Sequence, residues 1–409
     1  MNEPKIRFKG FQGEWETSII GDIATFSKGR GYSKSDLRSE GNPIVLYGRL
    51  YTNYSSVIES VDTFASLQNG SVLTKGNEVI IPGSGETPED IAVASAVEQK
   101  GVILGGDLNV LTFDQEKISP AFAAMSITYS NTHNELSGYA QGKTVVHLHN
   151  SSISKGHISY PYIDEQQSIS TYFQHLDALI QSTTKKIESL KQVKAASLLS
   201  MFPQEGETTP RVRFKGFEGE WEKKTLGDCL TINNERNQSN VYGINDVLSV
   251  SDEVGVVNQI KLLGRSYAGK SVVNYRVLKT KQIVYTKSPL KSKPYGIIKV
   301  NKGDIGIVSV LYAVYDANEN VYPDYIHYYF DPIHRINNYL LPLINKGAKN
   351  TMNISDEMAL TGNIWIPSLE EQKKIADYLQ ALDSQITLQT LRLEKLKQIK
   401  AACLDNMFV

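Results

Sequence analysis

Lysine, arginine and tyrosine side chains alternate through one stretch in the second half of the chain, from Lys261 to Lys302. Lysine and arginine neutralise phosphate groups, and tyrosine hydroxyls add hydrogen bonds that position a protein along a nucleic-acid backbone. An ordinary solvated surface also carries runs of charge, so the stretch admits both interpretations. We favour contact with DNA, for which the candidate residues are Lys261, Arg265, Lys270, Arg276, Lys287, Lys291 and Lys293.

The first half of the chain has a weaker analogue of this pattern. Four basic residues begin it, and tyrosines follow on either side of Arg49. Contact with DNA and a solvated surface explain this spacing equally well, and no single residue stands out as a reader of bases. The candidates for DNA contact here are Lys28, Arg30, Lys34, Arg49 and Tyr51.

The net charge of −1 conceals a contrast between parts of the chain. Residues Lys223 to Gly303 contain 14 lysine and arginine residues against five acidic ones, whereas Met1 to Ile163 contain 13 against 17. A local excess of positive charge attracts phosphates even where the whole chain is nearly neutral. The net charge therefore does not exclude a nucleic-acid partner.

Motifs that carry enzyme chemistry are incomplete in this sequence. The segment Ser137 to Thr144 resembles a phosphate-binding loop, but a serine stands where that motif requires its first glycine. Asn42 and Pro43 lack the following proline and aromatic residue of the adenine methyltransferase motif. Cys229 and Cys403 are too few and too far apart for a zinc site. We expect no catalytic residues, no metal site and no cofactor bound by this chain.

The sequence also lacks the signals of a membrane or secreted protein. No apolar run approaches the ~18–20 residues of a membrane span, and the N-terminus lacks the apolar core of a signal peptide. Two cysteines in 409 residues fit a reducing compartment. We expect the protein in the cytoplasm, without a membrane partner.

A long repeat organises these candidate residues. The segment Pro161 to Phe202 returns at Pro367 to Phe408, shifted by 206 residues without a gap. That period is too long for a solenoid. The chain is therefore two copies of one unit, and each copy ends in a long predicted helix.

A second repeat opens each half. The sequence IRFKGFQGEWE from Ile6 to Glu16 returns as VRFKGFEGEWE from Val212 to Glu222. Its aromatic side chains either fill a gap in the fold or contact a partner protein, and the sequence leaves both open. The candidates for partner contact are Phe8, Phe11, Trp15, Phe214, Phe217 and Trp221.

About 140 residues separate each opening motif from its helix, without a visible match between the halves. Runs rich in valine, isoleucine and tyrosine alternate there with glycine, asparagine and proline, which is typical of short strands and turns. Glu78 to Ile81 and Ile305 to Tyr312 are two predicted strands, and short helices are predicted around Pro120 to Tyr129 and Tyr325 to Phe330. Each half predicts a mixed α/β domain.

Apolar residues recur in alternating steps of four and three along both long helices, which predicts a heptad seam. Thr183 and Gln389 occupy one matching position in each seam, where a polar residue can fix the register. The predicted seam residues are Ile169, Phe173, Leu176, Ile180, Ile187, Leu190, Ile375, Leu379, Leu382, Ile386, Leu393 and Leu396.

The connection between the halves favours antiparallel helices. The linker Pro203 to Arg211 reaches at most about 31 Å, whereas a helix of about 37 residues is about 55 Å long. The alternative is two independent helices, each packed on its own domain. We predict an α+β fold in which two mixed α/β domains are separated by two long antiparallel coiled-coil helices, with a pseudo-twofold internal repeat.

These motifs and their order resemble the specificity subunit of bacterial type I restriction–modification enzymes. The resemblance rests on RFxGFxGEWE, the helix entry P-x-x-x-E-Q, the helix end KQxKxAxLxxMF and the duplication of all three, and it covers essentially the whole chain. It implies target-recognition domains at residues 1–160 and 203–366, the latter including the linker, and spacer helices at 161–202 and 367–409. Tyr162 and Ser368 stand where the family often has a second proline.

The resemblance also implies a function. Each domain would read one half of a bipartite, asymmetric site on double-stranded DNA, and the helices would set the gap and dock two modification subunits. Those partners would methylate adenine N6 with S-adenosylmethionine, and restriction subunits would cleave DNA with ATP and Mg²⁺. Two alternatives stay open: a coiled-coil adaptor that holds apart two modules for other ligands, and an inactive allele of the specificity subunit.

Overall fold

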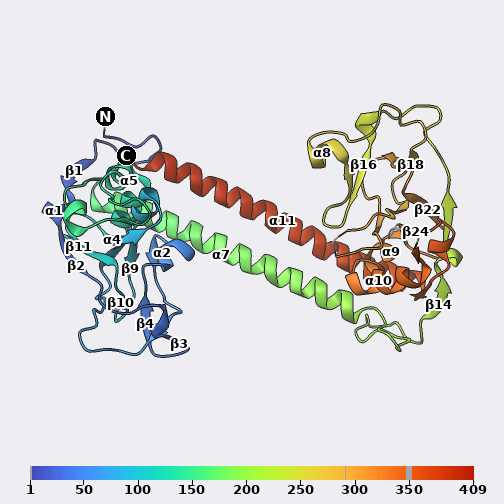
Figure 1. The fold of residues 1–409 in the computed structure, drawn as a ribbon, viewed down its shortest axis with the longest axis horizontal. Helices are drawn as coiled ribbons and strands as arrows, with labels where there is room; N and C mark the ends of the chain where they lie inside the picture. The colour runs from blue at the N-terminus through green and yellow to red at the C-terminus, as the bar shows by residue number, and fades with distance from the viewer. Residues whose placement is uncertain (1, 291, 347–351) are drawn as a thin grey trace. The chain divides into compact units, whose positions relative to one another are not determined.

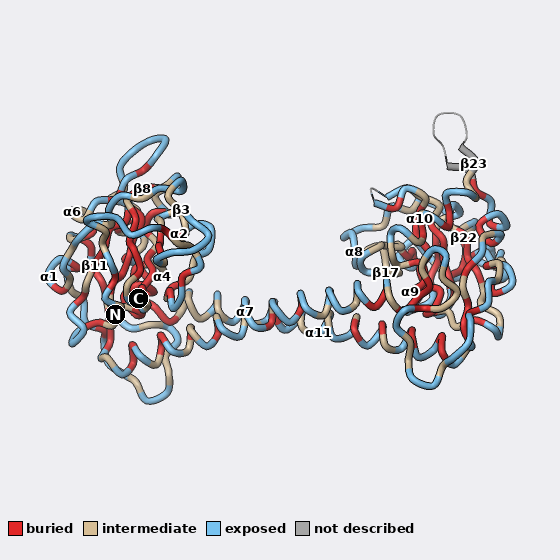
Figure 2. The backbone as a smooth tube through the Cα atoms, turned by 90° about the horizontal axis from the view of Figure 1, so that it is seen from below, coloured by how far each residue is buried: buried red, intermediate tan, exposed pale blue. Residues whose placement is uncertain are grey.

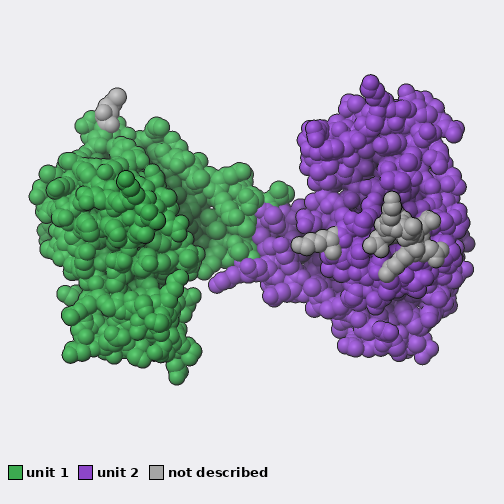
Figure 3. Space-filling model, in the orientation of Figure 1, with its two compact units in different colours: residues 1–184, 391–409 green, residues 185–390 purple. Residues whose placement is uncertain are grey.

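The computed structural model describes residues 2–290, 292–346 and 352–409. The chain forms two compact units, residues 1–184 with 391–409 and residues 185–390 (Figures 1 and 3). Each unit contains a mixed α/β lobe and parts of two long helices, α7 (Ile163–Ser200) and α11 (Leu369–Met407). Neither these nor the shorter described helices are long and apolar enough to cross a membrane.

A five-stranded sheet of order β2-β11-β7-β9-β5 forms the centre of the first lobe. Its first four strands are antiparallel to their neighbours, and β5 runs parallel to β9. Strand β7 is buried along its whole length, which explains its apolar residues Val79, Ile80 and Ile81. Figure 2 shows buried residues gathered inside this lobe. The strands are β2 (Ala24–Lys28), β5 (Val57–Ile58), β7 (Glu78–Pro82), β9 (Ser95–Val97) and β11 (Leu108–Phe113).

Smaller elements complete this lobe. A four-stranded sheet has the order β10-β4-β6-β3, β1 pairs with β13 and β8 with β12, and α4 packs on β7 and β9. These elements are β1 (Glu16–Ile19), β3 (Leu37–Arg38), β4 (Asn42–Val45), β6 (Phe64–Ala65), β8 (Ser84–Gly85), β10 (Ile103–Leu104), β12 (Val146–His147), β13 (His157–Tyr160), α1 (Ile20–Ile23), α2 (Arg49–Thr52), α3 (Pro88–Ile91), α4 (Pro120–Tyr129), α5 (Asn131–Gly138) and α6 (Asn150–Ile153).

The lobe of the second unit is built on a four-stranded antiparallel sheet of order β15-β22-β19-β20. Around it, β14 pairs with β25, β16 with β17, β18 with β21 and β23 with β24. The elements are β14 (Glu222–Thr225), β15 (Leu230–Asn233), β16 (Leu248–Ser251), β17 (Gly255–Asn258), β18 (Arg276–Leu278), β19 (Ile283–Tyr285), β20 (Ile298–Val300), β21 (Gly306–Val308), β22 (Ala313–Ala317), β23 (Asn345–Lys346), β24 (Met352–Asn353), β25 (Asn363–Ile366), α8 (Gln259–Leu263), α9 (Pro323–Tyr329) and α10 (Ile333–Leu340).

The two lobes repeat one topology although their sequences do not visibly match. The order β2-β11-β7-β9 corresponds to β15-β22-β19-β20 with the same antiparallel directions, and β1-β13 corresponds to β14-β25. The predicted helix at Pro120 to Tyr129 is confirmed, but the single strand predicted from Ile305 to Tyr312 is wrong. The chain turns there, with Tyr312 N–H donating to Ser309 C=O at 3.0 Å, and this turn separates β21 from β22.

Contacts inside each unit confirm that the long helices run antiparallel. In the first unit, the Tyr172 hydroxyl lies 3.5 Å from Cys403 Sγ, and Lys400 pairs with Asp177 further along α7. In the second unit, Lys194 pairs with Asp383 at 2.7 Å, and Ser197 lies beside Tyr378. In both places the residue number rises along one helix as it falls along the other.

The end of α7 completes the core of the second lobe, and the end of α11 completes the core of the first lobe. Phe202, just after α7, is fully buried in the second lobe, where its ring lies 5.6 Å from Tyr325 on α9. Phe408, just after α11, is buried in the first lobe, where its ring lies 5.7 Å from Phe122 on α4. The alternative of two helices that each pack only on their own domain is therefore wrong.

The predicted seam faces inward. All twelve residues of the seam are buried or half-buried. Thr183 is buried as well, and its hydroxyl donates to Leu179 C=O at 2.7 Å within the same helix. This bond satisfies the polar group without a partner from another element.

The two repeated motifs meet at the start of each long helix. Arg7 donates two hydrogen bonds of 2.7 Å to the buried Glu165 carboxylate, and Arg213 binds Glu371 in the same way. Gln166 accepts from Ser119 N–H and donates to Lys117 and Pro161 C=O. Gln372 binds the corresponding residues Tyr322, Asn320 and Pro367. The Glu-Gln pair thus fixes the opening motif and the α4 or α9 region to the helix entry.

Candidate nucleic-acid interface

Seven basic residues of the second lobe form ion pairs within the protein. The 50 residues from Val254 to Gly303 contain 11 basic residues and no acidic one. Carboxylates from outside this segment approach it in space and pair with most of its basic residues. The paired residues are Arg276, Lys279, Lys281, Lys287, Lys293, Lys299 and Lys302.

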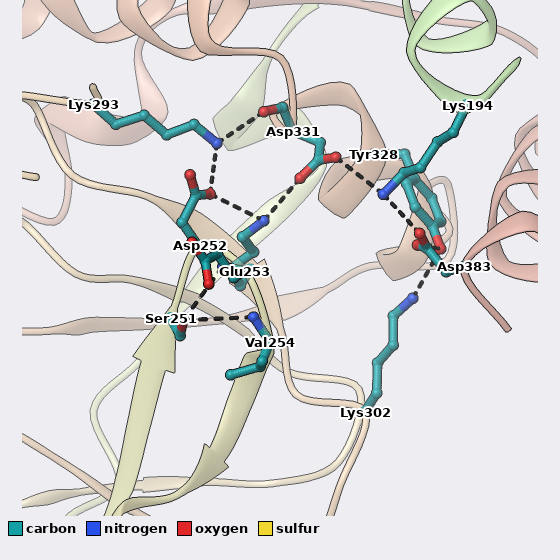
Figure 4. Close-up of polar contacts among 11 residues, drawn as sticks. Lys194, Ser251, Asp252, Glu253, Val254, Lys293, Lys302, Tyr328, Asp331 and Asp383 are labelled. Atoms are coloured by element: carbon teal, nitrogen blue, oxygen red, sulfur yellow. Dashed lines mark hydrogen bonds and ion pairs between the residues drawn. The ribbon is translucent and has the colours of Figure 1, made fainter. Parts of the chain in front are cut away.

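A chain of ion pairs holds several of these lysines in the second unit (Figure 4). Lys293 binds Asp252 at 2.6 Å, Lys299 bridges Asp252 and Asp331, and Lys194 continues the chain from Asp331 to Asp383 on α11. Burial opposes ionisation of Asp331, but the charges of Lys299 and Lys194 outweigh it and lower the pKa of this carboxyl well below its ordinary value. The network therefore connects the turn between β16 and β17 to both long helices.

The predictions of DNA contact for Arg276, Lys287 and Lys293 need correction. Arg276 and Lys293 are buried, and Arg276 and Lys287 share the carboxylate of Asp356. A buried charge must be paired, and the pairs occupy the groups that would bind phosphate. The sequence could not show this because the partner carboxylates lie far away along the chain. Lys291 lies outside the described residues.

The three remaining candidates of the second lobe lie close together in sequence. Lys261 is on α8, and Arg265 and Lys270 follow in the next loop; all three are exposed. The Arg265 guanidinium stacks 4.6 Å from the centre of the Tyr267 ring, which is itself 61% exposed. Figure 1 shows α8 with β16 and β18 at one end of this lobe, whereas α9 and α10 lie beside the long helices. The candidate residues of this lobe that are exposed and form no described ion pair thus lie together at α8.

The structure divides the candidates of the first lobe in a similar way. Lys28, Arg30 and Lys34 are exposed. Arg49 on α2 binds Asp62 at 2.8 Å, and the Tyr51 hydroxyl donates to Ser84 C=O at 2.7 Å. Burial raises the pKa of Tyr51, so this hydroxyl remains a neutral donor. Only the first three residues present charges that lack an internal partner within the described ranges.

The candidates for partner contact also separate into two groups. Trp15 and Trp221 are 3% exposed and belong to the two lobe cores, so the prediction that they contact a partner is wrong. Each packs edge-on against the aromatic residue that also contacts the end of a long helix, Phe122 for Trp15 and Tyr325 for Trp221. Large rings bury the most apolar area, which suits them to close a core.

The phenylalanines of the opening motifs remain at the surface in part. Phe8 packs edge-on against Tyr172, and Phe214 packs in the same way against Tyr378. Phe11 and Phe217 are half-buried. Each motif also contains an arginine that was not among the candidates. Arg7 and Arg213 bind the glutamates at the helix entries. The sequence did contain a signal for them: both the arginine and the Glu-Gln pair recur after the same shift of 206 residues.

One hollow of the first lobe carries the wrong charge for nucleic acid. A cavity of about 500 Å³ in the first lobe is lined by Tyr51, Tyr54 and His133 together with three carboxylates, Glu86, Glu89 and Asp90. An acidic wall repels phosphate. This cavity is therefore not a candidate for contact with DNA.

The comparisons with known proteins agree with the repeat. The model of the type I restriction modification DNA specificity domain matches residues 12–192 and again residues 218–398. The chain belongs to this family. Both ends of the second match are shifted by the same 206 residues that separate the sequence repeats. The resemblance inferred from the motifs is thereby confirmed.

A solved structure of a specificity subunit shows the same fold. The crystal structure of the S subunit of a type I restriction–modification system from M. genitalium has 13% sequence identity and a TM-score of 0.60, covering 100% of this chain and 99% of that one. The HsdS subunit from Thermoanaerobacter tengcongensis has 17% identity and a TM-score of 0.46, with coverage of 100% and 99%. No curated protein matches the chain.

Proposed function

We propose that this chain is the DNA-recognition subunit of a type I restriction–modification complex and binds a bipartite, asymmetric site. The observation that carries this proposal is the double match to the specificity-domain family within one chain. Each match contains one lobe of the shared topology, and the lobes differ in surface residues. Two different surfaces on one scaffold favour two different half-sites, one for each lobe.

Charge supports DNA as the ligand of both lobes. Lys28, Arg30 and Lys34 in the first lobe are exposed, as are Lys261, Arg265 and Lys270 in the second. Each exposed cation that contacts phosphate releases counterions, which gives the binding a steep dependence on salt. Six such contacts are enough to make binding fall by about three orders of magnitude between 50 and 200 mM salt.

The repeated helices support two identical partner proteins. Val193 on α7 and Ile399 on α11 occupy matching positions in the repeat, and both are exposed apolar residues. We propose that such matched surfaces dock two modification subunits, and that restriction subunits join this assembly. In this proposal the partners, and not this chain, bind S-adenosylmethionine, ATP and Mg²⁺ and carry out methylation and cleavage.

Methylation profiling tests the proposal directly. The chain would be purified with its modification subunits and incubated with a library of random DNA and S-adenosylmethionine, and methylated adenines would be mapped. The expected result is one split motif with a constant gap. Exchange of the lobe at residues 203–366 for that of another family member should change one half of the motif only. Methylation without a split motif, or a change in both halves, would contradict the proposal.

A further inference from the structure

The structure separates the basic residues of the Val254 to Gly303 segment that form ion pairs from those that form none among the described residues. Of the 11 basic residues between Val254 and Gly303, seven pair with carboxylates and one lies outside the described residues. The remaining three are Lys261, Arg265 and Lys270, within ten residues of each other. The basic residues of this segment that form no described ion pair therefore lie in one place, on α8 and in the loop after it.

Hydrogen bonds hold this loop in one conformation. Gly264 ends α8 with a positive φ of 77°, a backbone conformation that side chains disfavour, and the chain reverses there. The Gln259 amide oxygen then accepts from Tyr267 N–H at 2.7 Å and from the Ser266 hydroxyl at 3.3 Å. These bonds place Arg265 on the outside of the turn.

The same glutamine connects the loop to the rest of the unit. Its amide nitrogen donates to the Ser249 hydroxyl on β16 at 3.2 Å. The turn after β16 contains Asp252, whose carboxylate is held by Lys293 and Lys299 in the ion-pair chain (Figure 4). Arg265 is therefore presented by a supported loop, which lowers the entropy lost when it binds.

The chemistry of Arg265 differs from that of its two neighbours. A lysine is a point charge that suits phosphate, whereas the planar guanidinium donates two parallel hydrogen bonds and stacks on aromatic rings. In the major groove, two parallel donors match the O6 and N7 acceptors of guanine, and arginine to guanine is the commonest specific contact. Stacking on Tyr267 orients the plane of the guanidinium before DNA binds.

We propose that Arg265, oriented by Tyr267, reads a guanine in the half-site of the second lobe, and that Lys261 and Lys270 bind the phosphates beside it. This inference rests on the proposed function and adds a specificity-determining residue to it. Gln259 acts as a positioning residue, because it fixes the loop without reaching the DNA.

The test compares variants of the full chain assembled with its modification subunits. Methylation would be measured on a library in which every position of both half-sites is randomised. In Arg265→Lys the charge stays but the paired donors are lost, so preference for one G·C pair in the second half-site should fall by about 5- to 150-fold. Preferences in the first half-site should not change.

Lys261→Ala tests the loss of a phosphate contact, and Lys223→Ala tests the loss of a charge that contacts no DNA. Lys261→Ala should weaken binding to every sequence and reduce the salt slope by about 0.9, without changing the motif. Lys223 is an exposed lysine over the Trp365 ring, 5.9 Å from its centre, and is not a candidate for DNA contact. Lys223→Ala therefore removes an equal charge from the same unit and should leave motif and salt slope as in the wild type.

The outcomes distinguish this inference from the proposed function. If the wild-type complex methylates no split motif, the proposed function fails. If the wild type has a split motif and Arg265→Lys and Arg265→Ala keep its full discrimination at every base, the assignment of Arg265 is wrong. Equal losses in both half-sites would also overturn it, because they would indicate altered assembly. Thermal unfolding of each variant complex shows whether the lobe is intact.

Discussion

The ion pair between Arg213 and Glu371 allows a quantitative prediction. The Glu371 side chain is 1% exposed and accepts hydrogen bonds of 2.7 and 2.8 Å from Arg213. The bond to Glu371 raises the pKa of Arg213, so this guanidinium keeps its positive charge. Arg213→Ala would leave a buried carboxylate without its cation, while the rest of the α11 entry is unchanged.

The cost of an unpaired buried charge gives the size of the effect. Removal of one member of a buried pair costs about 3–5 kcal/mol. We therefore expect Arg213→Ala to destabilise the second unit by about 3–5 kcal/mol at pH 7.

The stability deficit relative to the wild type should lie in the second unit, which contains both members of the pair. Urea unfolding, followed by hydrogen exchange that resolves peptides of the two units, measures the deficit.

Three variants provide the controls. Arg7→Ala breaks the equivalent pair and should give a similar deficit in the first unit. Arg213→Ala with Glu371→Gln should recover much of the loss, since no charge is left buried. Arg211→Ala removes a cation from an exposed pair with Glu207 and should cost less than about 1 kcal/mol. A double variant as unstable as the single one would refute the argument.

Three further predictions concern the core, a histidine and the helices. Phe202→Ala should destabilise the second unit by about 3–5 kcal/mol in urea unfolding, because it empties the site beside Tyr325. Burial lowers the pKa of His327 to about 3, so folding stability should fall by up to about 1.4 kcal/mol per pH unit below about pH 6.5, and His327→Gln should remove that part of the slope between pH 7.5 and 5. Insertion of one heptad into both α7 and α11 should lengthen the gap of the methylated motif and keep both half-sites, and an unchanged gap would contradict the spacer function.

Periodicity made the helices predictable. The apolar residues of a heptad stripe recur in consecutive helical turns. Their spacing in the local sequence therefore determines which face of the helix is buried. The inward position of Leu379 and Phe173 follows from that stripe alone. The antiparallel direction required one further fact, the shortness of the linker, and the prediction was correct.

The repeated topology of the lobes could not be seen in the sequence. Buried strands require apolar residues of suitable size but not particular ones, so β7 and β19 keep their place in the sheet with different sequences. Sequence identity disappears at such positions while the hydrophobic pattern remains. The repeat stays visible where a specific bond is required, as between Arg7 and Glu165.

The candidate interface was predicted only in part, for an electrostatic reason. Sequence shows where positive charge is, but whether it is available depends on carboxylates that the fold brings near it. Arg276 and Asp356 are 80 residues apart in the chain and form a bond in the fold. Arg265 has no such partner in the described part of the structure, and nothing in its local sequence distinguishes it from Arg276.

The placement of the helix ends explains which residues the two halves share. Phe202 closes the core of the second lobe beside Trp221, and Phe408 closes the core of the first beside Phe122. Each half therefore supplies a part that the other lobe needs, and a change in one helix end must fit a core encoded by the other half. The loop after α8 supplies no part of the other half's core, and its residues Arg265, Tyr267 and Lys270 are exposed. The repeat can hold the opening motifs, helix entries and helix ends constant while the surfaces proposed to read DNA diverge, and one scaffold can then recognise two unlike half-sites.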